Sequence, residues 1–278
     1  MSAATEKIAF LRASLARVDG LEAHARVSLG HPTADACLRG GIQKGALHEI
    51  YPAAARDEAA ASGFAVALAV RVAAKKRVLW LRPDFAALEG GELSALGLLE
   101  MGFDPTRMLL LRAADAASAL RAALDALSCK ALGAIVIEIP GAPKILDLAA
   151  SRRLVLACAQ TGVTAFLLRM MAEPEASAAE TRWLIRAARS HPPSGALARA
   201  TSPASGGGKE EEDWGSPLFE TDLVRNRHGR TGHWVIEWSC DDGLFRTANP
   251  GAVVSAPSDR PAAAAMERAG RANMSRVA

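Results

Sequence analysis

The residues that would bind phosphate in a nucleotide-binding protein are missing from the place where this sequence predicts them. Residues 52–62 form an expected loop between a strand at 45–51 and an apolar helix at 63–74. A phosphate loop here would have the pattern Gly-x-x-x-x-Gly-Lys-Ser/Thr. Its glycine amides surround the phosphates, its lysine reaches the outer phosphates, and its hydroxyl binds Mg²⁺. The loop contains no glycine and no Gly-Lys pair, and it carries Asp57 and Glu58. We therefore expect no ATPase activity.

Two carboxylates stand near the ends of expected buried strands. Glu138 lies at the carboxyl end of a strand at 134–139, and Asp84 follows a strand at 77–81. Ligands of parallel α/β proteins bind at this edge of the sheet, and ATPases place a carboxylate there beside Mg²⁺. Without a phosphate loop neither carboxylate has a phosphate-bound metal to serve. We therefore interpret both as helix-capping or surface residues.

No other pattern specifies catalysis or a metal centre. The sequence has no Gly-x-Ser-x-Gly nucleophile motif and no His-x-x-x-His pair, and its six histidines are dispersed. His48 lies inside the 45–51 strand, which is more typical of a packed or hydrogen-bonded histidine than of a catalytic base. We interpret the four scattered cysteines as buried free thiols: Cys37, Cys129, Cys158 and Cys240. The sequence thus predicts no metal and no cofactor.

One basic cluster has a defined shape. Strands at 219–225 and 231–238 flank a turn that contains glycine, which predicts a β-hairpin. Arginines around such a turn can bind phosphates through their planar guanidinium groups. The candidate DNA- or partner-binding residues are Arg225, Asn226, Arg227, His228 and Arg230. The alternative is that these charges only keep the tip of a hairpin solvated.

The elements that position these residues alternate along the chain. The nearly continuous apolar run at 77–81 suits a parallel strand buried on both faces. Further strands are expected at 108–111, 134–139, 163–169 and 181–188, and helices at 93–101, 116–127 and 146–161. Strands that alternate with helices of this length predict an α/β fold with a mostly parallel, doubly wound sheet.

Changes in composition divide the chain into five parts. Residues 1–26 contain a helix whose apolar stripe packs on its own domain or is offered to a partner, and residues 27–189 form the α/β core. Residues 190–218, with Pro-Pro, a glycine run and an acidic run, are expected to be a flexible linker. The hairpin at 219–249 then packs on the core. Residues 250–278, rich in Ala, Pro and Arg, are expected to be disordered.

Length and charge narrow the classes of protein that remain. The 278 residues suffice for one substantial core, and the net charge of +3 is too small to indicate a nucleic-acid partner by itself. No apolar run approaches the roughly 20 residues that span a bilayer, and the N-terminus lacks the features of a signal peptide. We therefore expect a cytoplasmic protein.

Several segments, in this order, resemble RecA. Residues 28–51 are similar to the segment that precedes the RecA phosphate loop, and they end in Gly-Gly-Ile-Gln-Lys-Gly-Ala-Leu-His-Glu-Ile-Tyr. Residues 98–111 and 133–138 are similar to the segments of RecA that lead to the strand with its metal-site carboxylate. The closer resemblance is to the ImuA family of bacterial mutagenesis operons. Its characteristic ending is similar to residues 222–238, which include Arg-Asn-Arg-His-Gly-Arg.

The resemblance implies a RecA-like core and a role in the bacterial SOS response to DNA damage. ImuA-like proteins are implied to act beside ImuB, a catalytically inactive relative of Y-family polymerases, and a mutagenic DnaE-type polymerase. Together they carry out error-prone synthesis past lesions. The resemblance implies RecA as a further partner and makes single-stranded DNA a candidate ligand. The chain connections after Glu138 and Arg169 are shorter than the RecA loops that hold single-stranded DNA, so RecA's mode of DNA binding is not implied.

Three other hypotheses fit the same residues. The first is a degenerate ATPase that still binds nucleotide through other residues. The second is an inhibitor resembling SulA, a related protein without a phosphate loop that blocks the division protein FtsZ; the extended C-terminal hairpin favours ImuA over it. The third is a regulator that caps RecA filaments through the shared subunit surface.

Overall fold

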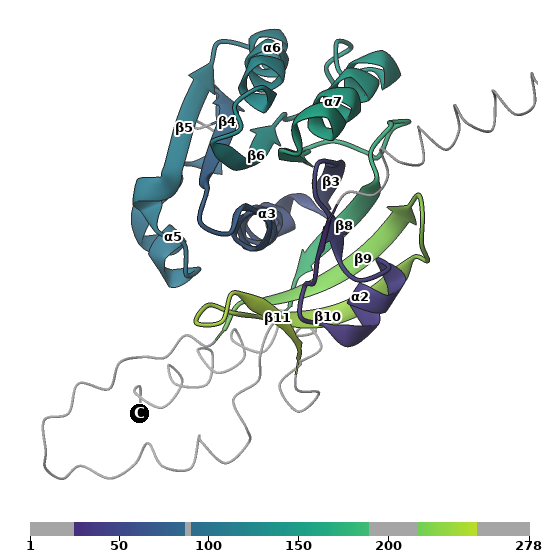
Figure 1. Cartoon of the computed structure of the whole chain (residues 1–278). Coiled ribbons are helices and arrows are strands. Elements are labelled where there is room, and N and C mark those ends of the chain that lie inside the picture. The colour runs from purple at the N-terminus through teal and green to yellow at the C-terminus, as the bar shows by residue number, and fades with distance from the viewer. Residues whose placement is uncertain (1–24, 87–89, 189–215, 249–278) are drawn as a thin grey trace, which may run out of the picture.

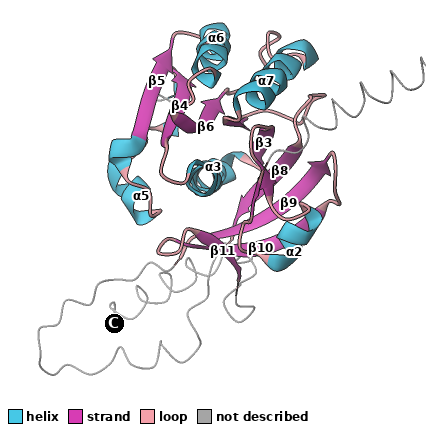
Figure 2. Cartoon of the chain, viewed as in Figure 1, coloured by secondary structure: helices cyan, strands magenta, loops and turns pink. Residues whose placement is uncertain are grey.

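The computed structural model describes residues 25–86, 90–188 and 216–248, and in this part of the chain a nine-stranded sheet is flanked by helices (Figures 1 and 2). The sheet order is β11-β10-β9-β8-β3-β7-β6-β4-β5. Its strands are β3 (Leu47–Pro52), β4 (Arg77–Pro83), β5 (Met108–Ala113), β6 (Leu132–Glu138), β7 (Thr164–Leu168), β8 (Thr181–Ala187), β9 (Leu218–Asn226), β10 (Gly232–Ser239) and β11 (Leu244–Thr247). A separate small ribbon pairs β1 (Arg26–Val27) with β2 (Ile42–Gln43).

The strands from β8 to β5 are parallel, which confirms the predicted α/β fold with a mostly parallel sheet. The sequence reason is clearest in β6, at the centre of the parallel part, where every residue is buried. A strand with helices on both faces has no solvent side, so its apolar residues run continuously instead of alternating. The helical elements are α2 (Pro32–Cys37), η1 (Ala55–Asp57), α3 (Glu58–Ala73), α5 (Ala95–Glu100), η2 (Pro105–Arg107), α6 (Ala116–Leu127) and α7 (Leu148–Thr161).

The helices divide the interior into two cores. Helix α3 packs on one face of the sheet, and α6 and α7 pack on the other (Figure 1). Both outer helices begin at an aspartate that accepts a hydrogen bond from a backbone N–H in the first turn: Asp115 from Ser118 and Asp147 from Ala150, each at 2.7 Å. Such caps satisfy donors that the helix leaves unpaired, and they fix where each helix starts at the edge of the sheet.

The C-terminal hairpin is part of the main sheet. Strand β9 pairs antiparallel with β8, and β10 and β11 extend the sheet further. Trp183, Phe219, Trp238 and Phe245 from these strands form an aromatic cluster with Phe64 of α3. The hairpin therefore shares its core with the parallel strands.

Some boundaries differ from the sequence prediction. Helix α3 begins at Glu58 and not at residue 63, because the alanine-rich residues after Glu58 favour helix over the predicted loop. The sequence does not predict strands β2 and β11, because both are too short to show the alternation of apolar and polar residues that identifies a strand. The predicted N-terminal helix, most of the predicted linker and the predicted disordered tail lie outside the described residues. Within the described part of the chain, no helix is long and apolar enough to cross a membrane.

Candidate phosphate- or partner-binding interface

The position of the absent phosphate loop is filled by carboxylates of the chain itself. The turn from β3 to α3 passes through η1, and Asp57 and Glu58 stand at the start of α3. The buried Asp57 carboxylate accepts a hydrogen bond from the backbone N–H of Ala187, at 3.1 Å. A helix N-terminus attracts anions because its first amides are unpaired and its dipole is positive there. Here that end of α3 already carries two negative side chains of its own.

Glu138 is buried, so its interpretation as a surface or capping residue was wrong. It accepts hydrogen bonds from the indole N–H of Trp80, at 2.9 Å, and from Arg82 Nη2, at 3.1 Å. Arg82 also donates to the carbonyl of Gly91, at 2.8 Å. The buried ion pair lines a cavity of about 390 Å³ beside α3. Asp84, by contrast, is exposed, as the sequence predicted.

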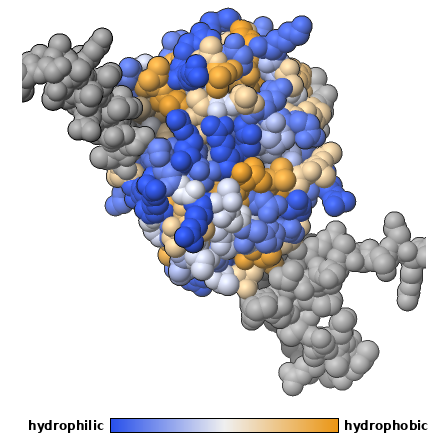
Figure 3. Space-filling view, turned by 90° about the vertical axis from the view of Figure 1, so that its right-hand side faces the viewer, coloured by the Kyte–Doolittle hydropathy of each residue, from blue (hydrophilic) through white to orange (hydrophobic). Residues whose placement is uncertain are grey.

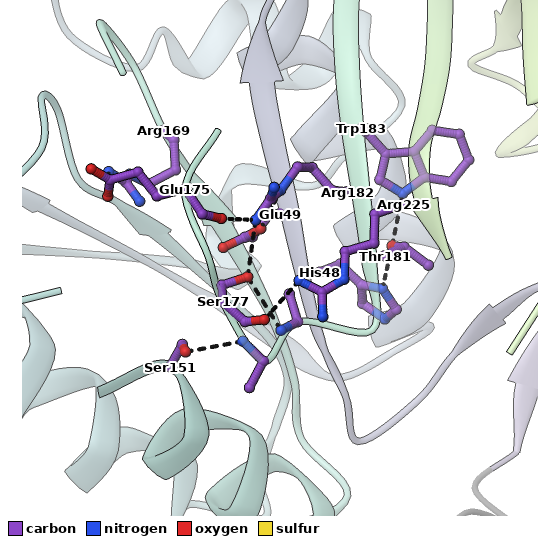
Figure 4. Close-up of polar contacts among 12 residues, drawn as sticks. His48, Glu49, Ser151, Arg169, Glu175, Ser177, Thr181, Arg182, Trp183 and Arg225 are labelled. Carbon is purple, nitrogen blue, oxygen red and sulfur yellow. Dashed lines mark hydrogen bonds and ion pairs between the residues drawn. The ribbon is translucent and has the colours of Figure 1, made fainter. Parts of the chain in front are cut away.

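His48 is a packed, hydrogen-bonded histidine, which confirms its interpretation. Its Nε2 donates to the carbonyl of Gln43 at 2.8 Å, because a carbonyl only accepts, and its Nδ1 therefore accepts from the Thr181 hydroxyl, also at 2.8 Å. The Thr181 oxygen in turn accepts from the indole N–H of Trp183 (Figure 4). This chain of hydrogen bonds needs neutral imidazole, and burial lowers the pKa of His48 to about 4.

Stability is expected to fall between pH 6.5 and pH 4 because of His48. The unfolded state takes up a proton near the ordinary pKa of 6.5, whereas the folded state resists protonation until about 4. At a rate of about 1.4 kcal/mol per pKa unit, up to about 3 kcal/mol of the free energy of unfolding is lost across this window. Urea unfolding measured at several pH values checks this.

The His48→Gln variant provides the comparison, because glutamine keeps one donor and one acceptor without the titration. We expect its stability to depend less on pH than that of the wild type. Equal slopes for wild type and His48→Gln would contradict the assignment.

The connection between β7 and β8 is held against the body of the protein. Arg182 donates to Glu49 Oε2 at 2.7 Å and to Ser177 Oγ at 3.1 Å, and also to the Glu175 carbonyl. Arg225 donates to the Ser177 carbonyl at 2.7 Å, and Ser151 of α7 accepts from the backbone N–H of Ala178 at 3.0 Å (Figure 4). One of the two predicted short connections is therefore fixed by hydrogen bonds from three different elements.

The predicted hairpin residues do not all point the same way. Arg225 turns toward this connection, and its guanidinium is engaged by the Ser177 carbonyl. Asn226 closes the turn: its Nδ2 donates to the carbonyls of Cys37, at 3.0 Å, and Arg230, at 3.1 Å. His228 Nε2 lies 3.5 Å from Glu180 Oε2. Arg225 and Asn226 thus serve to fix the hairpin in place.

Close contact seats the hairpin tip on the end of α2. A Cβ added at Gly229 would lie 2.1 Å from the carbonyl oxygen of Cys37, so only glycine fits there. This contact places Arg227, His228 and Arg230 beside Arg39, which follows α2 with a φ of 55°. Together these four side chains line a depression of about 700 Å³. We call it the basic groove.

The basic groove has the exposure that anion binding needs. Arg39, Arg227 and Arg230 are all exposed. The Arg227 guanidinium donates a long hydrogen bond to the Ala178 carbonyl, at 3.3 Å. The face of the molecule that carries α2 and the end of β9 is largely hydrophilic, with separate hydrophobic patches (Figure 3). Sequence reasoning missed Arg39, which is almost 190 residues from the hairpin; its only signal was the Arg-Gly-Gly turn after α2.

The four cysteines are free, but only Cys158 is buried, so the prediction of buried thiols was correct for that residue alone. Burial on the inner side of α7 raises the pKa of Cys158 to about 12. Cys37 and Cys240 are half-buried and Cys129 is exposed. No group of three or more His, Cys, Asp or Glu side chains among the described residues is arranged to hold a metal ion.

Fold and site together define an α/β protein consistent with a RecA-like core, in which the position of the phosphate loop carries the chain's own carboxylates. No family model matches the chain. It is 32% identical over 226 residues to Protein ImuA from two strains of Caulobacter vibrioides, an alignment that covers 76% of this chain and 82% of each relative. The chain belongs to the ImuA family.

Proposed function

We propose that this protein is a non-catalytic accessory protein of damage-inducible mutagenesis. In this role it bridges ImuB, the mutagenic DnaE-type polymerase and RecA during error-prone translesion synthesis in the SOS response. Membership of the ImuA family supports the assignment to mutagenesis. The protein assists by holding partners together and uses no catalytic centre of its own.

The non-catalytic part of the proposal is supported by the two carboxylates at the start of α3. A polyphosphate at this position would meet the carboxylates of Asp57 and Glu58, and like charges at close range repel. Asp57 is also committed to the backbone N–H of Ala187, so the carboxylate has a structural use that phosphate would disrupt. The charge of Glu138 is likewise paired with Arg82, and its oxygens accept hydrogen bonds from Trp80 and Arg82.

The basic groove supports a second part of the proposal, in which the protein contacts phosphates of single-stranded DNA. Three exposed guanidinium groups and one imidazole converge on one depression, and arginine binds phosphate oxygens with two parallel hydrogen bonds. No base-reading geometry is implied, so we expect binding that depends on salt and little on sequence.

Fluorescence anisotropy with labelled single-stranded DNA across a salt series tests the groove. We expect binding that does not need ATP and that weakens steeply with salt. Changing Arg39, Arg227 and Arg230 together to alanine should lower the slope of log K against log[salt] by about 2, because each lost phosphate contact removes about 0.7. The control variant removes three exposed cations elsewhere, Lys144, Arg152 and Arg153, and should bind like the wild type.

Equal losses in the two variants would show that only net charge matters and would remove the groove from the proposal. If neither form binds DNA, the DNA-contacting part of the proposal is contradicted. The bridging role is tested separately, by copurification with ImuB and RecA. Failure to retain either partner would contradict the bridging role. Hydrolysis of Mg-ATP by the purified wild type would contradict the non-catalytic assignment.

A further inference from the structure

The edge strand β5 exposes more apolar surface than a protected sheet edge does. It ends the sheet on the side opposite β11 (Figure 1), and Leu109, Leu110 and Leu111 are 40%, 43% and 40% exposed. Natural edge strands are guarded by proline, lysine, a bulge or a covering segment, because their free N–H and C=O groups pair with other strands. In β5 the residues from Met108 to Leu111 are all apolar, and the charged side chain of the strand, Arg112, lies near its end.

The leucines of β5 lie on both faces of the sheet. Leu109 and Leu111 lie beside Leu79 and Leu81, which belong to the core under α6 and α7. Leu110 lies beside Trp80, which belongs to the core under α3. A strand added next to β5 would therefore bury apolar side chains above and below the sheet, and it would satisfy the free backbone groups of β5 as well.

The two ends of β5 carry opposite charge. Beside its start lie Lys75, Lys76 and Arg77, all exposed, and Arg107, which donates to the Ala74 and Lys76 carbonyls. Asp104, which caps the turn before β5, is a carboxylate near this end. The charged residues beside the other end are Asp84, Glu92, Arg112 and Asp115. Asp84 is hydrogen-bonded through its backbone N–H to the Ala113 carbonyl, and Arg112 is paired with Glu92. The start of the edge is thus basic, and its end is acidic.

We propose that β5 pairs antiparallel with β5 of a second copy of this chain, which makes a two-fold symmetric dimer with a continuous sheet. In this arrangement the basic end of each strand meets the acidic end of the other, and the leucines of both copies are covered. A parallel neighbour of the same sequence would bring like charges together, which is unfavourable. A two-fold interface needs such a self-complementary patch. This inference goes beyond the proposed function and does not depend on it.

Sedimentation velocity of the full chain over a range of concentrations tests the dimer. We expect the wild type to dimerise and Leu110→Lys to raise the dimer dissociation constant at least tenfold. Leu156→Lys is the matched control: Leu156 on α7 is 60% exposed and lies away from β5, so this variant should dimerise normally. Circular dichroism establishes that both variants are folded.

A charge swap tests the antiparallel register independently of the leucines. Lys75→Glu and Asp84→Lys should each raise the dissociation constant about fivefold, because each change occurs twice in a symmetric dimer. The double variant should recover the wild-type value. A wild type that stays monomeric up to about 100 µM, or a double variant weaker than either single one, overturns the proposal.

Discussion

Changing Glu138 to alanine is expected to lower the free energy of unfolding by about 3–5 kcal/mol. The side chain is buried and accepts hydrogen bonds from Trp80 and Arg82. Without it, the Arg82 guanidinium keeps the Gly91 carbonyl but loses its counter-charge, and the indole N–H of Trp80 is left without an acceptor. An unpaired charge in a buried site costs more than the ion pair contributes in its intact form. Urea unfolding followed by tryptophan fluorescence measures the effect.

A paired replacement separates this structural role from a catalytic one. Arg82→Met combined with Glu138→Leu removes both charges and fills the space with apolar atoms, so it should recover most of the lost stability. A catalytic Glu138 would give the opposite pattern, in which the single variant folds as stably as the wild type but loses an activity. A single variant within about 0.5 kcal/mol of the wild type would contradict the buried ion pair.

Trp238→Ala is expected to destabilise the whole described sheet by about 3–5 kcal/mol. Trp238 of β10 is fully buried and packs against Phe245, with the ring centroids 4.8 Å apart and the ring planes tilted by 59°. Its indole N–H donates to the Met101 carbonyl at 3.0 Å. Because the aromatic cluster also contains Phe64 of α3, the loss should reach the parallel strands. Urea unfolding monitored by circular dichroism should show one transition at a lower urea concentration.

Val224→Ala is the matched control, because Val224 on the neighbouring strand β9 is 47% exposed and its loss should cost less than about 0.5 kcal/mol. If the hairpin were an independent module, Trp238→Ala would instead give two separate transitions, with the parallel part unfolding as in the wild type. That result would contradict the shared core.

The local pattern of the sequence determined most of the parallel half of the fold. Helix α6 has the predicted bounds, 116–127, because its apolar stripe has a helical period and Asp115 caps its first turn. The apolar runs of β4 and β6 identified buried parallel strands for the same reason: strands covered on both faces have no polar side. The missing phosphate loop was also evident, since that motif is contiguous and its absence needs no tertiary information.

The burial of a residue and the direction of its side chain depend on neighbours that are distant in the sequence, and only the tertiary structure decided them. The sequence placed Glu138 at a strand end but not inside the protein, because its partners Trp80 and Arg82 lie more than 50 residues away. Arg225 and Arg227 look equivalent in the hairpin sequence, yet in the structure only Arg225 donates a hydrogen bond to the Ser177 carbonyl. Arg39 joins the groove only because Gly229 lets the hairpin touch the end of α2. Local periodicity encodes elements, whereas burial and side-chain direction follow from which elements meet.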